Sequence, residues 1–136
     1  MQVIPPAPTV KAPMERFTGD VYLNTLHTGQ NPSRLVAAIV RFTPGARTNW
    51  HSHPLGQTLH CIGGAGFVAT RDGSVILMRS GDTIHTPPGE EHWHGAIRDN
   101  MMCHLALVEH DDGQSATWLE PVTDEAYETV HTLTGR

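Results

Sequence analysis

The chain has 136 residues, which is enough for one domain with a core of its own. Nine lysines and arginines against fourteen acids give a formal charge of -5 and a pI near 6.0, which argues against nucleic acid or an anionic membrane as the main partner. No apolar run approaches membrane-spanning length, and prolines interrupt the N-terminal stretch where a signal peptide would need continuous apolar residues. We therefore expect a cytoplasmic protein.

The first sixteen residues predict an extended arm, because they are rich in proline and offer little to bury. A strand exchanged with a partner subunit is the alternative to a free arm. Residues 17–136 are then expected to form a single domain.

Short strands separated by glycine turns are expected to make up most of this domain. The strands are predicted at residues 17–26, 35–42, 48–53, 57–62, 65–70, 74–79, 82–86, 91–97 and 101–109. Gly63-Gly64 is predicted to be a hairpin turn between two of them. Near the C-terminus, Thr123 is placed to cap a short helix over 124–131. Together these elements predict an all-β domain, either a double-sheet barrel or a jelly roll.

Two glycine-framed motifs carry the chemistry of the chain. The first is Gly45-x5-His51-x-His53-x3-Gln57-x6-Gly64, and the second is Gly81-x5-Pro87-x-Gly89-x2-His92. Residues two apart on a strand share a face, so His51 and His53 can bind one ion. We interpret His51, His53, Gln57 and His92 as a four-ligand metal centre.

The proposed donors are all neutral. Three imidazoles suit Zn, Fe, Mn, Ni, Co or Cu, and an amide adds no charge. A divalent ion there would keep its full positive charge, attract an anion or polarised oxygen, and lower the pKa of a bound hydroxyl.

The sequence predicts different positions and roles for the other histidines. His94 shares the parity of His92, and His104 lies among apolar residues, so both are expected inside the barrel, where acid–base chemistry and hydrogen-bonded packing stay open. Weaker candidates are His60, His85 and His110, whereas His27 and His131 are expected at the surface. Trp50 and Trp93 are expected to pack between layers, and Cys61 and Cys103 to be free thiols.

These motifs resemble those of the cupin superfamily, G-x5-H-x-H-x3,4-E-x6-G and G-x5-P-x-G-x2-H-x3-N. Gln57 stands where that pattern has glutamate, and Ala96 where it has asparagine. Residues 47–57, 87–95 and 118–127 are similar to small bacterial cupins related to carboxymuconolactone-decarboxylase-associated proteins, some of which are manganese-dependent hydroxynitrile lyases with a His3Gln site. His60 and His85 depart from that subgroup, which has apolar or aromatic residues there.

The resemblance implies a cupin jelly roll with His51, His53, Gln57 and His92 as metal ligands. It also implies manganese as the metal (with Fe, Zn, Ni or Co as alternatives), a homodimer or homotetramer, and the following site residues. His94 and His104 would lie in the active-site shell, and Ala38, Val40 and Val108 would line the substrate pocket.

Three functions follow as hypotheses. The first is a lyase acting on a small hydroxylated or carbonyl substrate, with His104 or His94 moving the proton. The second is a dioxygenase of the quercetinase type, and the third is a non-catalytic, metal-bearing small-molecule binder. In each the partner is a small molecule.

Overall fold

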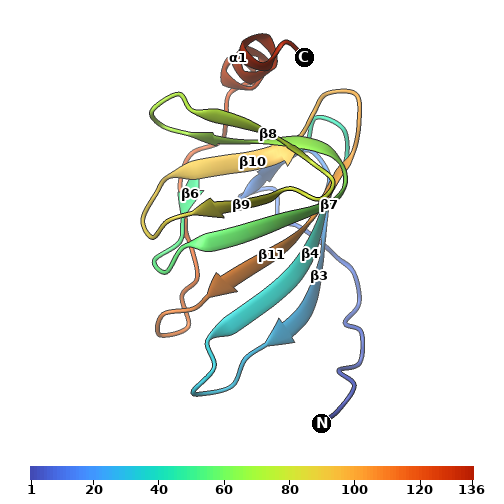
Figure 1. The fold of residues 1–136 in the computed structure, drawn as a ribbon, viewed down its shortest axis with the longest axis vertical. Helices are drawn as coiled ribbons and strands as arrows, with labels where there is room; N and C mark the ends of the chain where they lie inside the picture. The colour runs from blue at the N-terminus through green and yellow to red at the C-terminus, as the bar shows by residue number, and fades with distance from the viewer.

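The computed structural model describes all 136 residues, which form two antiparallel sheets curled into one barrel (Figure 1). The elements in chain order are β1 (Val10–Lys11), β2 (Phe17–Thr18), β3 (Val21–Thr28), β4 (Leu35–Phe42), β5 (Arg47–Thr48), β6 (His51–Ser52), β7 (Gln57–Thr70), β8 (Val75–Arg79), β9 (Thr83–Thr86), β10 (His92–Ala96), β11 (Met102–Glu109), β12 (Thr117–Trp118) and α1 (Asp124–Thr134). The all-β jelly-roll prediction is confirmed.

The first sheet has the order β1-β3-β4-β11-β7, with β9 on the other side of β7. The second sheet contains β8, β7, β10, β5 and β2, and β6 joins it through β10. Figure 1 shows the strands stacked from β8 to β3, with α1 beyond β8 and the N-terminal arm running beside the opposite end. No helix of the structure combines the length and the apolar character needed to cross a bilayer.

Strand β7 belongs to both sheets, and this corrects the predicted hairpin at Gly63-Gly64. Its first half pairs with β11 and β9, and its second half pairs with β10 and β8. The chain does not reverse there. Gly64 adopts a left-handed φ of 73°, and the pairing register with β11 shifts between Cys103 and His104. Such an irregularity bends a strand, so the glycines turn the chain from one sheet into the other.

Two further boundaries differ from the predictions. The strand expected over 48–53 is split into β5 and β6, because Asn49 and Trp50 bond to segments outside both sheets. Helix α1 begins as expected, with the Thr123 hydroxyl accepting from the Ala126 amide, but it continues to Thr134.

The surface position predicted for His131 is wrong. The longer helix buries this ring against Phe67 and Tyr127. Its Nδ1 donates to the Tyr127 carbonyl, and its Nε2 accepts from the Arg98 amide, so the buried imidazole has partners at both nitrogens.

Two apolar clusters hold the layers together. The larger one lies inside the barrel and includes Phe42, Leu59 and Cys61, and the smaller one lies under α1 and includes Trp93 with Trp50 packed against it. The predicted packing role of the two tryptophans is therefore confirmed. Both cysteines are free, as expected.

The bend in β7 generates a prediction about stability. A side chain at Gly64 would be strained at this φ and would collide with the Met101 carbonyl, whereas Gly73 has a similar φ of 89° but nothing within 4 Å. We expect Gly64→Ala to lower the free energy of unfolding by about 3 kcal/mol or more, and Gly73→Ala by about 1 kcal/mol. Urea denaturation measures both. Equal losses in the two variants would contradict the role assigned to the bend.

Candidate metal centre

The three motif histidines meet at one point inside the barrel. His51 lies on β6, His53 follows in the turn, and His92 opens β10 directly opposite His51 in the antiparallel pairing. Each ring has a nitrogen within 4.8 Å of a nitrogen on each of the other two, and all three residues are buried. The structure thus brings the two sequence motifs into one cluster.

The second motif is joined to the first through the backbone. The Gly89 amide donates to the His53 carbonyl at 2.9 Å, and the Gly56 amide donates to the same oxygen at 3.2 Å. The turn after β9 and the turn after β6 therefore share one acceptor. This contact fixes the loop that delivers His92 against the loop that holds His53.

Each of the three rings donates its Nδ1 hydrogen to a backbone carbonyl. His51 donates to Asn49 at 2.9 Å and His92 to Glu90 at 2.9 Å. His53 donates to Ser115. Because a carbonyl oxygen only accepts, Nδ1 must carry the hydrogen in every ring, which leaves the Nε2 lone pair free for a ligand.

The amide of Gln57 completes the group of donors. Gln57 begins β7, is buried, and places Oε1 3.1 Å from His92 Nε2. With Nδ1 protonated, that nitrogen and this oxygen are both acceptors, and two acceptors so close are compatible when a cation lies near them. His53 Nε2 is buried and has no hydrogen-bond partner. Three imidazoles and one amide oxygen therefore fit a divalent transition metal.

Burial favours the neutral form of the three clustered rings. It lowers the pKa of His51 well below the ordinary value, helped by the proximity of His92, and it lowers the pKa of His53 in the same direction. Burial also lowers the pKa of His92 to about 4. Neutral donors leave the charge of a bound divalent ion uncompensated by the protein.

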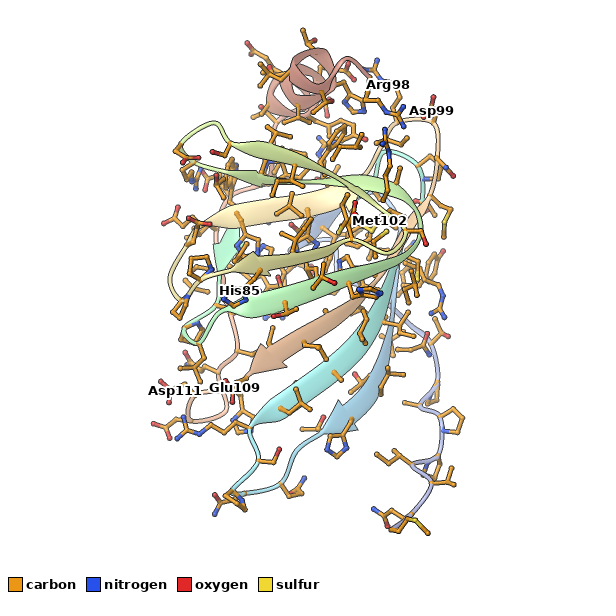
Figure 2. The ribbon with its side chains drawn as sticks, in the orientation of Figure 1. His85, Arg98, Asp99, Met102, Glu109 and Asp111 are labelled. Carbon is orange, nitrogen blue, oxygen red and sulfur yellow. The ribbon has the colours of Figure 1, made fainter.

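His94 and His104 form a buried pair beside the ligands. The His104 Nε2 and His94 Nδ1 atoms are 3.0 Å apart, and the His94 ring centre is 5.2 Å from that of His51. Figure 2 labels Met102 and Glu109 at the two ends of β11, so His104 reaches the pair from within that strand. His94 Nε2 is buried without a partner. The pair can therefore accept or donate a proton at this nitrogen.

A cavity of about 240 Å³ opens onto this group. Its walls include both members of the histidine pair and three of the four proposed ligands. The three apolar residues that the resemblance to cupins assigned to the pocket, Ala38, Val40 and Val108, also line it.

Sequence reasoning gave no role to Trp118, which also lines the cavity. Its ring stacks on His51, with centres 4.5 Å apart and planes at 24°. Trp118 lies on β12, a two-residue strand, so no periodic pattern marked it. Only its pairing with β6, which is a tertiary contact, places it beside a ligand.

Asn49 was also missed, although it positions the proposed ligand His51. Its carbonyl accepts from His51 Nδ1, and its side chain donates to the carbonyls of Glu15 and Leu119 at 2.9 and 3.2 Å. The N-terminal and C-terminal segments are thus fastened to the residue that orients His51. A lone asparagine between two strands gives no sequence signal for such a role.

The remaining histidine candidates lie away from the cluster. His60 and His85 are on the outer side of β7 and β9, where they bond to Thr83 and Thr58, and Figure 2 shows His85 beside β9. His110 follows β11 and does not line the cavity. None of the three joins the proposed centre.

Comparison with known proteins agrees with this fold and site. The family model described as "Cupin domain" matches residues 38–109. An (R)-mandelonitrile lyase from Granulicella tundricola is 45% identical over 117 residues, covering 86% of this chain and 89% of that protein. A crystal structure of a cupin-like protein from Thermotoga maritima is 38% identical, with a TM-score of 0.83 over 88% of this chain and 90% of that one. A cupin-2 domain from Rhodospirillum rubrum, at 16% identity and a TM-score of 0.70 over 94% of this chain and 88% of that one, shares the fold.

The chain therefore belongs to the cupin family. Its buried histidine cluster lies where the two motifs meet, and it has the donors to hold a metal.

The buried pair makes the stability of the metal-free protein depend on pH. Burial lowers the pKa of His104 to about 4, against an ordinary value of 6.5. Between these values the unfolded chain binds a proton that the folded protein excludes, so stability falls as the pH is lowered through this window. From about pH 7 to about pH 4.5 we expect His104 alone to account for about 2 kcal/mol. Urea unfolding at both pH values should show a smaller drop in His104→Met, and an unchanged drop would contradict the assignment.

Proposed function

We propose that this cupin is a metal-dependent lyase of the hydroxynitrile lyase type, which cleaves a small cyanohydrin into a carbonyl compound and hydrogen cyanide. The observation that carries the proposal is the unpartnered Nε2 of His94, backed by His104, next to a neutral set of three histidines and one glutamine. The identity to an (R)-mandelonitrile lyase supports the class of reaction.

We propose that His51, His53, Gln57 and His92 hold the metal, with manganese as the ion. When bound, a divalent ion supplies Lewis acidity toward the oxygen of the substrate. The neutral donors leave that acidity undiminished, because no carboxylate is placed among them.

The histidine pair provides the path for the proton. His94 Nε2 accepts the hydrogen of the substrate hydroxyl while its Nδ1 hydrogen is held by His104 Nε2, 3.0 Å away. The oxygen keeps the O–H electron pair and forms the carbonyl, and the bond to the nitrile carbon breaks, with its electron pair leaving on cyanide. The proton on His94 then passes to cyanide, which departs as hydrogen cyanide. His104 holds the ring of His94 in one orientation throughout.

The cavity limits the substrate to a small molecule. Its volume of about 240 Å³ lies below the range of roughly 300–1,000 Å³ that is usual for drug-sized ligands. Apolar walls at Ala38, Val40 and Val108 favour an aromatic or aliphatic group on the carbon that carries the hydroxyl.

We also propose that the protein works as a homodimer or homotetramer. Leu26, Leu35 and Ile62 are 41%, 39% and 48% exposed on strands of the first sheet. Apolar side chains left exposed on a sheet favour contact with another copy.

The test is cyanide release from (R)- and (S)-mandelonitrile by protein reconstituted with Mn, Fe or Zn. We expect catalysis above the spontaneous rate, and a fall of about 100-fold in His94→Ala at unchanged metal content. His85→Ala removes an exposed histidine of the outer sheet face and should keep full activity.

Two outcomes would contradict the proposal. Full turnover in His94→Ala would remove the proton-transfer role. Oxygen uptake with an enol such as quercetin, in the absence of cyanide release, would assign the site to a dioxygenase instead.

A further inference from the structure

The walls of the metal cavity contain no aspartate or glutamate and a single residue with a permanent charge, Arg16. The whole chain has fourteen acids and a formal charge of -5, so their absence from these walls is a local feature. An arginine at the wall of an otherwise uncharged cavity gives it a positive potential.

Arg16 is fixed at its backbone. Its carbonyl accepts from the Asn49 amide at 2.8 Å, and its own amide donates to the Pro13 carbonyl at 3.1 Å. The same Asn49 orients the ligand His51 through its own carbonyl. The backbone of Arg16 is therefore held in a fixed position relative to the metal ligands.

The guanidinium itself is free to bind an anion. Its carbon lies 5.4 Å from the centre of the Trp118 ring, and Trp118 stacks on His51 with centres 4.5 Å apart. The cation thus lies no more than about 10 Å from a metal ligand. The five ion pairs of the structure involve Lys11, Arg47, Arg71 and Arg98, and none of them includes Arg16.

The nearest acid in sequence does not neutralise this charge. Glu15 contributes its backbone carbonyl to Asn49, but its carboxylate neither pairs with Arg16 nor lines the cavity. The planar fork of a guanidinium matches a carboxylate with two parallel hydrogen bonds.

We infer that the cavity selects a substrate that carries a carboxylate, with Arg16 as the residue that recognises it. The reacting hydroxyl or carbonyl group faces the His94 side of the cavity, and the carboxylate lies toward the mouth, beside the Arg16 guanidinium. This inference rests on the proposed function for the identity of the reacting group, but the recognition of the carboxylate depends only on the cavity and Arg16.

The selectivity follows from charge and from shape. A neutral ligand gains apolar contact with Trp118 and the aliphatic wall, whereas a carboxylate adds charge-assisted hydrogen bonds to a guanidinium that has no acidic partner in the structure. Because Arg16 is exposed, solvent and salt screen part of this gain. We therefore expect an advantage of roughly 10-fold in affinity over a neutral analogue.

The experiment compares 4-(hydroxymethyl)benzoate with its neutral amide, 4-(hydroxymethyl)benzamide, by isothermal titration calorimetry on manganese-loaded and metal-free protein. Both probes offer one hydroxyl and one ring, and they differ in the charge at the far end. Binding of the benzoate should be roughly 10-fold tighter and should weaken as the salt concentration rises.

Three variants test whether Arg16 causes the preference for the benzoate. Arg16→Gln should bring the two probes to within about two-fold of each other, and Arg16→Lys should keep part of the preference. Arg34→Gln removes the same charge from an exposed position outside the cavity and should leave the preference unchanged. Thermal unfolding checks that each variant is folded, and the salt dependence of the unmodified protein tests the inference without any substitution.

The carboxylate-binding role of Arg16 and the proposed lyase function can be disproved independently of each other. Equal affinity for the two probes, or a preference that survives in Arg16→Gln, would overturn the role of Arg16 whether or not cyanide is released. A preference lost in Arg16→Gln would uphold the role even if no cyanohydrin were cleaved, because the readout is binding and not turnover.

Discussion

Three hydrogen bonds from histidine Nδ1 atoms to backbone carbonyls set the orientation of the buried histidine cluster. The carbonyls belong to Asn49, Ser115 and Glu90, and they come from three separate loops. Each bond fixes the tautomer of its ring, so that Nε2 is left as a lone-pair donor. Burying imidazoles without partners would be costly, but these three rings are paired at Nδ1 and present a preorganised set of nitrogen donors that could hold a metal.

The barrel is built so that these loops meet. Pairing of β6 with β10 places His51 opposite His92, and the His53 carbonyl accepts amides from the turns on both sides. The Asn49 side chain ties in the N-terminal and C-terminal segments through the carbonyls of Glu15 and Leu119. Strand pairing and contacts between residues distant in sequence therefore both position the histidine cluster.

Glycine spacing and strand alternation are local properties, and they were sufficient to predict the fold class and the histidine cluster. The apolar wall of the cavity was predicted from the resemblance to cupins. The sequence was insufficient where a residue acquires its role through tertiary pairing. Trp118 stacks on His51 because β12 pairs with β6. Arg16 lines the cavity from a segment whose backbone is hydrogen-bonded to Asn49. Gly63-Gly64 was misinterpreted because a bend between two sheets and a hairpin turn use the same residues. His131 was misplaced because the helix continues beyond the predicted end and packs onto the barrel.

The central claim is that three histidines and one glutamine hold one metal ion in this chain. The most direct measurement is the metal content of tag-free protein, after loading with manganese and dialysis, for the unmodified chain, His92→Ala and His85→Ala. The account predicts about one ion per chain in the unmodified protein and in His85→Ala, and almost none in His92→Ala. Equal retention by all three proteins, or no retention by any of them under any loading, would contradict it.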